Sequence, residues 1–177
     1  EWNNLLRMMQ KSKIISYKQA VALTKELKSK GKKIIFKSGC YDIFHIGHAR
    51  SLARIKKDAD ILIVGVGTDS TLRELKGPDR PIFPEYYRAE LISYLEIVDY
   101  VVILQEPLKD RIDHEKFLSL VRPDFYSLPP TDKALSVKRQ MAKKYGIKIK
   151  LKAEIKNWKT GVLISSTALL NRLKQWG

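Results

Sequence analysis

Lys33-Ile-Ile-Phe-Lys-Ser38 is a short apolar run closed by Gly39, and it predicts a strand buried inside a sheet. Two further runs, Ile61-Leu-Ile-Val-Gly-Val66 and Tyr100-Val-Val-Ile-Leu104, are rich in β-branched residues. Such runs are typical of parallel strands that are covered on both faces. Pro123-Asp-Phe-Tyr-Ser127 predicts a weaker fourth strand.

A fifth strand is predicted from a different pattern. Ile147-Lys-Ile-Lys-Leu-Lys152 alternates strictly, so one face is apolar and the other is a row of lysines. This pattern is typical of an edge strand that is half exposed to water, where lysines discourage the pairing of one sheet with another.

Helical segments separate the predicted strands. They span residues 17–30, 48–57, 84–95, 132–145 and 165–175. This alternation with short joints predicts an α/β fold, Rossmann-like and doubly wound, with a mainly parallel five-stranded sheet in a single domain. We expect residues 1–16 to be an N-terminal extension and residues 17–177 to be the domain itself.

The composition narrows the class of protein. With 177 residues, 44% hydrophobic and 30% charged, the chain suits one ordinary globular domain. Its longest apolar stretch, residues 61–67, is far shorter than the roughly 20 residues that cross a bilayer, and residues 1–10 lack the apolar core of a signal peptide. The single cysteine, Cys40, excludes an internal disulfide framework. We expect a cytoplasmic protein with no membrane partner; because the chain starts at Glu1 rather than Met, an upstream domain stays open.

The formal net charge of +15 is unevenly distributed. Residues 1–60 carry 14 Lys and Arg against 5 Asp and Glu, residues 133–177 carry 12 against 1, and the middle of the chain carries 8 against 13. The basic C-terminal quarter suits a solvated surface, a small phosphate ligand or nucleic acid, in that order of preference. Nucleic acid is therefore the least favoured partner, although charge alone does not decide between the three.

Two of the three histidines, His45 and His48, follow the first predicted strand and precede the next helix. In a doubly wound sheet this is the carboxyl edge, where ligands bind. The N–H groups of a helix start favour anions there, and Gly47 lets a phosphate approach the backbone. Each imidazole could donate a hydrogen bond to phosphoryl oxygens as charge develops. Capping or packing histidines are the alternative, and the lack of another His or Cys cluster argues against metal ligands.

Other nucleotide-binding motifs fit poorly. Gly65-Val-Gly-Thr-Asp-Ser70 has a serine where a dinucleotide-binding loop needs its third glycine. No phosphate-binding loop of the GxxxxGK[ST] type occurs in the sequence. NAD binding and P-loop chemistry are therefore not expected.

Gly39-Cys-Tyr-Asp-Ile-Phe-His-Ile-Gly-His48 resembles the GxFDxxHxGH signature of the nucleotidyltransferase superfamily of cytidylyl- and adenylyltransferases. Further similar blocks follow in order, and together they cover about residues 14–175. They are residues 60–69, Leu75-Lys-Gly-Pro-Asp-Arg-Pro-Ile82, Glu85, Arg88-Ala-Glu-Leu91, residues 98–103 and Ile164-Ser-Ser-Thr-Ala-Leu-Leu170. The block at 75–82 and Arg88 resemble the sugar-phosphate branch, typified by the adenylyltransferase domain of ADP-heptose synthesis.

The resemblance implies a role for each matching residue. His45, His48 and Lys76 would be catalytic, with the histidines on the triphosphate and its α-phosphoryl group. The nucleotide would be bound by the signature, by two charged residues further along and by the hydroxyl-rich start of the last helix: Ser38, Gly39, Cys40, Tyr41, Asp42, His45, Gly47, His48, Arg88, Asp132, Ser165, Ser166 and Thr167. Mg²⁺ would arrive with the triphosphate, and no protein metal site is expected. The alternative for Lys76 and Arg88 is a surface salt bridge. The alternative for the hydroxyl groups of residues 165–167 is simple capping of the last helix.

The predicted activity is transfer of a nucleoside monophosphate from an NTP, with ATP favoured, to a sugar 1-phosphate of the heptose kind, with release of pyrophosphate. A cytidylyltransferase acting on glycerol 3-phosphate or another polyol phosphate is the runner-up. A degenerate scaffold that binds RNA or another partner is a third hypothesis, because Tyr126-Ser-Leu-Pro-Pro-Thr-Asp132 departs from the glycine-rich stretch of this branch. Tyr41 likewise stands where the signature has Phe. Homodimers are common among relatives, and a homodimer stays open for this chain.

Overall fold

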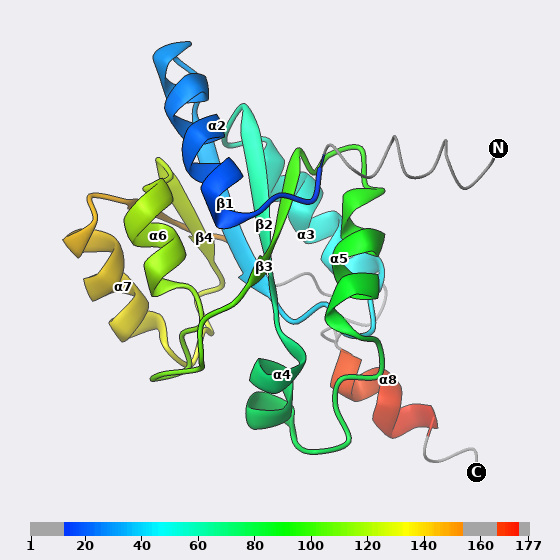
Figure 1. Ribbon diagram of the computed structural model, residues 1–177. Helices are drawn as coiled ribbons and strands as arrows, with labels where there is room; N and C mark the ends of the chain where they lie inside the picture. The colour runs from blue at the N-terminus through cyan, green and yellow to red at the C-terminus, as the bar shows by residue number, and fades with distance from the viewer. Residues whose placement is uncertain (1–12, 154–165, 174–177) are drawn as a thin grey trace, which may run out of the picture.

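The carboxyl ends of five parallel strands form one edge of a single sheet with the order β3-β2-β1-β4-β5 (Figure 1). The computed structural model describes residues 13–153 and 166–173. The strands are β1 (Ile34–Gly39), β2 (Ile61–Gly67), β3 (Tyr100–Leu104), β4 (Phe125–Leu128) and β5 (Lys148–Leu151). The order reverses between β1 and β4, which is where doubly wound sheets bind ligands. The predicted fold class is confirmed, and the described sheet is parallel throughout.

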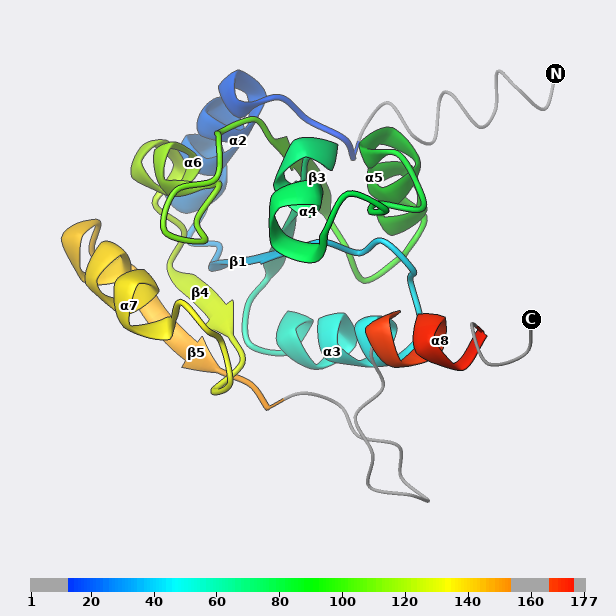
Figure 2. The same ribbon diagram turned by 90° about the horizontal axis from the view of Figure 1, so that it is seen from below.

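Helices cover both faces of the sheet (Figures 1 and 2). Three lie on one face and two on the other: α2 (Tyr17–Ser29), α6 (Glu115–Val121) and α7 (Leu135–Lys144) on the first, α3 (Ile46–Lys56) and α5 (Glu85–Ser93) on the second. Neighbouring strand residues enter opposite cores. Phe36 packs in the cluster that contains Phe117, whereas Ile35 packs in the cluster that contains Leu52 and Ile92. Burial of each side chain of this size contributes roughly 1.5–3 kcal/mol to the free energy of folding, so both layers of helices stabilise β1.

Two more helices, α4 (Asp69–Lys76) and α8 (Ser166–Leu173), lie beyond the carboxyl edge of the sheet (Figure 1). The sequence patterns did not predict α4 or α6, because each is only seven or eight residues long. Helix α7 begins at Leu135 rather than at Asp132, since the Asp132 carboxylate accepts a hydrogen bond from Ala134 N (2.9 Å) and holds a turn there.

The two edges of the sheet differ in how they are covered. Ile14 forms a bridge with Val101 of β3, and the backbone N–H of Ile15 donates to Val101 O (2.9 Å). At the other edge β5 pairs only with β4 among the described strands, which confirms the predicted edge strand. Its apolar face is incompletely covered, because Leu151 is 43% exposed. None of the helices in the described part of the chain is long and apolar enough to cross a membrane.

Candidate active site

A cavity of about 330 Å³ opens at the carboxyl ends of β1 and β4, where the strand order reverses. The turn after β1, the start of α3, the end of α4 and the start of α8 all contribute to its wall. Most of the predicted site residues line it: Ser38, Gly39, Cys40, Tyr41, Asp42, His45, Gly47, His48, Lys76, Ser166 and Thr167. The histidine pair and the first turn of α8 therefore meet at one cavity, although 117 residues lie between His48 and Ser166 in the sequence.

The imidazoles of His45 and His48 are stacked, with ring centroids 3.9 Å apart and planes inclined at 22°. His45 is the N-cap residue of α3, and its Nδ1 accepts a hydrogen bond from Gly47 N (3.1 Å). Nδ1 of His48 accepts one from His45 N (3.3 Å). A ring nitrogen that accepts carries no proton, so in each neutral ring the proton is on Nε2. The helix start thus leaves one Nε2–H donor on each ring for an anionic oxygen.

The surroundings of His48 keep its imidazole uncharged. Burial, together with the positive charges of His45 and Lys37, lowers the pKa of His48 to about 4. Phe44 stacks on this ring at 5.4 Å, and Tyr41 meets it edge-on at 5.3 Å between centroids. Burial also lowers the pKa of His45. At pH 7 His48 is therefore a neutral hydrogen-bond donor rather than a cation.

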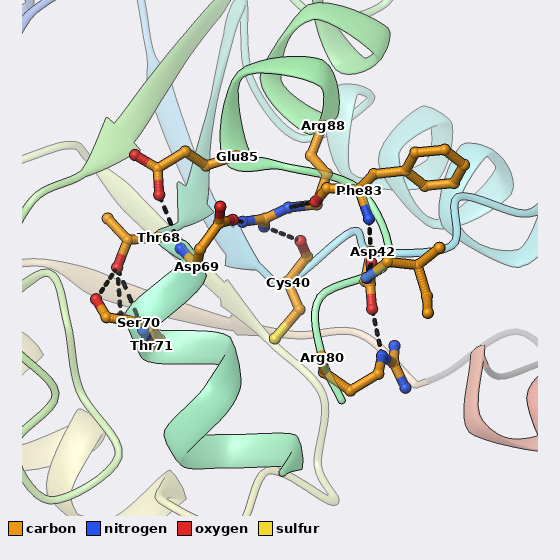
Figure 3. Close-up of polar contacts among 11 residues, drawn as sticks. Cys40, Asp42, Thr68, Asp69, Ser70, Thr71, Arg80, Phe83, Glu85 and Arg88 are labelled. Atoms are coloured by element: carbon orange, nitrogen blue, oxygen red, sulfur yellow. Dashed lines mark hydrogen bonds and ion pairs between the residues drawn. The ribbon is translucent and has the colours of Figure 1, made fainter. Parts of the chain in front are cut away.

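Asp42 is a buried residue of the cavity wall, and its carboxylate joins two segments that are distant in sequence (Figure 3). Its Oδ1 accepts from the backbone N–H groups of Ile82 (2.7 Å) and Phe83 (3.1 Å), and its Oδ2 pairs with the Arg80 guanidinium. Arg80 itself lines the cavity. The Asp42 carboxylate therefore holds a cation in the wall and does not present free oxygens to a ligand.

Arg88 is not among the residues that line the cavity, and its predicted contact with a phosphate stays a prediction. Its side chain is 1% exposed and donates to Phe83 O (2.8 Å), Cys40 O (2.6 Å) and Asp69 Oδ1 (2.7 Å) (Figure 3). These bonds fasten the turn after β1 to the start of α4 and to the segment before α5. Burial with three acceptors makes Arg88 a support for the cavity wall.

Asp132 is also not among the residues that line the cavity, and its predicted contact with the nucleotide stays a prediction. Its Oδ1 accepts from Ala134 N (2.9 Å), and its Oδ2 pairs with Lys138 Nζ (2.9 Å). Burial raises the pKa of Asp132, but these partners outweigh burial and hold that pKa below its ordinary value. The carboxylate therefore belongs to the start of α7.

Lys76, the last residue of α4, is exposed and lines the cavity without an ion-pair partner among the described residues. Ser166 and Thr167 open α8, whose first N–H groups favour an anion. The Ser166 hydroxyl donates to Ile43 O (3.0 Å), which joins this helix start to the segment before His45. Ser165, predicted beside them, lies outside the described residues.

The family model described as Cytidylyltransferase-like matches residues 36–172. The chain belongs to this family. The membership confirms the prediction of a nucleotidyltransferase, and the match includes the histidine pair and the first turn of α8.

Solved structures resemble this cytidylyltransferase-like protein. The lipopolysaccharide core biosynthesis protein from Thermoplasma volcanium GSS1 is 32% identical with a TM-score of 0.58, over 72% of this chain and 99% of that one. The pantoate-beta-alanine ligase of Francisella tularensis has a TM-score of 0.60 at 18% identity, over 89% of this chain and 72% of that one. The second likeness concerns the fold alone.

Curated relatives are longer proteins. The bifunctional protein HldE of a Nitratiruptor species is 41% identical over 111 residues, which are 63% of this chain and 23% of that protein. The HldE protein of Sulfurimonas denitrificans is 39% identical over 111 residues, which are 63% of this chain and 22% of that protein. The match thus spans less than a quarter of the length of these relatives.

Several residues of the cavity wall were not singled out from the sequence of this cytidylyltransferase-like protein. Three cations, two serines and two apolar residues complete the wall: Lys37, Arg80, Lys152, Ser51, Ser127, Ile55 and Pro129. Arg80 lies in the 75–82 block that resembles the sugar-phosphate branch, but no role was predicted for it. Lys37 and Lys152 belong to no such block, and in a sequence a lysine in or just after a strand resembles any solvated lysine.

The described residues offer no ready-made site for a metal ion. Within the described residues, no group of three His, Cys, Asp or Glu side chains could hold one. Asp42, the carboxylate that lines the cavity, is already bonded to Arg80 and to two backbone N–H groups. The donor set of the described residues therefore does not fit a resident divalent cation.

Proposed function

We propose that this protein is an adenylyltransferase that transfers AMP from ATP to a sugar 1-phosphate of the heptose kind and releases pyrophosphate. The observation that carries the proposal is the convergence of two neutral Nε2–H donors, the first turn of α8 and several cations on one cavity. Such a site suits a triphosphate, because its charge is spread over many oxygens that need separate donors.

In the proposed reaction, a phosphate oxygen of the sugar 1-phosphate attacks the α-phosphorus of ATP. A bond forms between that oxygen and the phosphorus, and the bond between the α-phosphorus and the bridging oxygen to the β-phosphate breaks. The bonding electrons leave with pyrophosphate. No covalent enzyme intermediate is needed, so the protein acts by positioning the reactants and by stabilising charge.

His45 and His48 are proposed to donate their Nε2–H groups to oxygens of the α-phosphoryl group as its charge rises. Lys76 is proposed to supply a mobile cation to the phosphates, because it is exposed at the cavity without a partner among the described residues. The first turn of α8 is proposed to bind the terminal phosphates. The nucleotide pocket would otherwise be formed by the turn after β1, including Gly39 and Cys40.

Mg²⁺ is proposed to enter already bound to the triphosphate. The donor set around the cavity does not fit a resident ion, so the ligands of Mg²⁺ would be phosphate oxygens and water. The ion would neutralise charge on the leaving pyrophosphate, and the residues above would act on the remaining oxygens.

The choice of a sugar phosphate rests on the sequence blocks of the sugar-phosphate branch. The relatives named HldE and the relative named as a lipopolysaccharide core biosynthesis protein support it. A cytidylyltransferase for glycerol 3-phosphate is a second candidate, because two residues of the divergent stretch, Ser127 and Pro129, line the cavity. A changed wall at that place could favour a different base or acceptor.

Pyrophosphate release with a panel of nucleotides and acceptors tests the proposal. ATP, CTP, GTP and UTP are each paired with sugar 1-phosphates and with glycerol 3-phosphate in the presence of Mg²⁺. Release from ATP with a sugar 1-phosphate supports the proposal, and release from CTP with glycerol 3-phosphate supports the second candidate. Salt-sensitive retention of RNA together with inert triphosphates would contradict both and favour a binding protein.

Residues 1–16 would be an extension of a domain formed by residues 17–177, with the end of the extension held against β3 by Ile14 and Ile15. We propose a cytoplasmic location, and light scattering on the purified protein would test for a homodimer.

A further inference from the structure

Four side chains form a hydrogen-bonded chain that runs from the core to the cavity. His114 lies between Asp113 and Tyr126: its Nδ1 is 2.7 Å from Asp113 Oδ1, and its Nε2 is 2.6 Å from the Tyr126 hydroxyl. That hydroxyl is 3.3 Å from Ser38 Oγ. His114 is 1% exposed and Tyr126 is fully buried, whereas Ser38 is half-buried and lines the cavity.

The direction of each hydrogen bond follows from the first. A carboxylate of Asp113 can only accept, so Nδ1 of His114 is the donor in that bond. If the imidazole carries only that one proton, Nε2 is an acceptor and the Tyr126 hydroxyl donates to it. Because the proton of Tyr126 is committed, the Ser38 hydroxyl must donate to the Tyr126 oxygen. Ser38 is left with lone pairs and no free proton.

We propose that this chain fixes Ser38 as a hydrogen-bond acceptor that takes a hydroxyl group of a sugar in the ligand. Ser38 is then a specificity-determining residue, and Asp113, His114 and Tyr126 are positioning residues. An ionised phosphate oxygen is itself an acceptor and gains nothing from Ser38. The inference rests on the proposed function for the presence of a sugar in the cavity.

The hydrogen-bonded chain also assigns a role to the divergent stretch, residues 126–132. Tyr126 is the first residue of the segment that departs from the sugar-phosphate branch, and its ring packs against Phe36 at 5.6 Å between centroids. Packing alone needs only a phenyl ring. The hydroxyl group adds the link between His114 and Ser38.

The sugar hydroxyl could belong to the acceptor or to the ribose of the nucleotide. Steady-state pyrophosphate release, with one substrate varied at a time, separates the two sources. Removing the Ser38 hydroxyl should raise the KM of one substrate about 3- to 10-fold, as loss of one neutral hydrogen bond predicts, with kcat changed less than about twofold. A raised KM for the sugar phosphate identifies the acceptor. A raised KM for ATP that is not seen with a deoxyribose analogue identifies the ribose.

The variants are Ser38→Ala, Tyr126→Phe and the double variant, with Ser38→Thr as the conservative replacement. Tyr17→Phe is the control, because the Tyr17 hydroxyl also donates to a side chain, Glu106 (3.1 Å), and Tyr17 does not line the cavity. We expect the double variant to match Ser38→Ala, since both changes break one chain, and we expect Ser38→Thr to restore the KM. Tyr17→Phe should leave both KM values unchanged.

Additive effects of the two changes, or a fall in kcat and melting temperature with both KM values unchanged, would overturn the inference. Calorimetric binding of a sugar 1-phosphate and of pyrophosphate separates this failure from failure of the proposed function. Suppose that the wild-type protein has no transferase activity but binds the sugar phosphate more tightly than Ser38→Ala does, while both proteins bind pyrophosphate equally. That result would contradict the proposed function and support the inference. A wild-type protein that binds neither the sugar phosphate nor ATP would contradict both.

Discussion

The ring of Tyr41 lies against the backbone of Gly39, so that a β-carbon at residue 39 would be 2.8 Å from both Cε2 and Cζ of that ring. Tyr41 is 4% exposed and has a φ of 51°, so neither its ring nor its backbone moves easily. The same ring meets His48 edge-on. The absence of a side chain at Gly39 therefore helps to hold the histidine pair in place.

Gly39→Ala should destabilise the protein by about 1–3 kcal/mol, because the new methyl group overlaps a packed ring. Chemical denaturation measures the change. The double variant with Tyr41→Leu should recover part of the loss, since the smaller side chain leaves room for the methyl group. Equal stability of Gly39→Ala and wild type would show that the ring can move aside.

His48→Ala should lower kcat on the order of 100-fold, as loss of a donor to the charged transition state predicts. His45→Asn is the companion variant, because Asn keeps an acceptor for Gly47 N and thus keeps the cap of α3. It should lower kcat similarly with little change in melting temperature. Unchanged kcat in either variant would contradict the role proposed for that residue.

The buried imidazole of His48 should make stability depend on pH. Its pKa is about 4 in the folded protein against an ordinary value of 6.5, so below pH 6.5 the unfolded chain binds a proton that the folded one does not. The contribution of His48 is complete above about pH 6.5 and is lost as the pH falls toward 4, by roughly 2–3 kcal/mol. Urea unfolding of wild type and His48→Asn at about pH 7.5 and 4.5 checks this. Parallel pH profiles of the two proteins would contradict it.

Arg88 and Lys76 should respond in opposite ways to substitution. Arg88→Lys loses the fork that reaches three acceptors, so it should destabilise the protein by about 2–4 kcal/mol. Lys76→Ala should leave the melting temperature nearly unchanged and weaken binding of tripolyphosphate, measured by calorimetry. A stable Arg88→Lys protein with weakened phosphate binding would return Arg88 to the role that the resemblance implied.

The strands were predictable because burial on both faces requires continuous apolar runs, as in residues 61–66 and 100–104. The edge strand was predictable because its lysines alternate. Short helices were not, since α4 buries only Thr71 and Leu72 and shows no repeated apolar stripe. The fold class thus follows from local patterns, whereas the helices at the sheet edge depend on tertiary contacts.

The histidine pair was predictable because it follows a buried strand at a helix start. The partners of Arg88 were not predictable, because a sequence does not show whether an arginine faces a ligand or three buried acceptors. Ser127 was missed for a related reason, since only the register of β4 against its neighbours brings its residue to the cavity. Side-chain partners, unlike strand positions, are fixed by distant parts of the chain.

Cys40 offers a last consequence. Its carbonyl oxygen is held by Arg88, and burial raises the pKa of its thiol, so the thiolate is scarce at neutral pH. Peroxides and alkylating agents attack the thiolate. Cys40, the only cysteine of the chain, should therefore react slowly with these reagents. The cavity would keep its shape at oxidant concentrations that inactivate proteins with an exposed active-site sulfur.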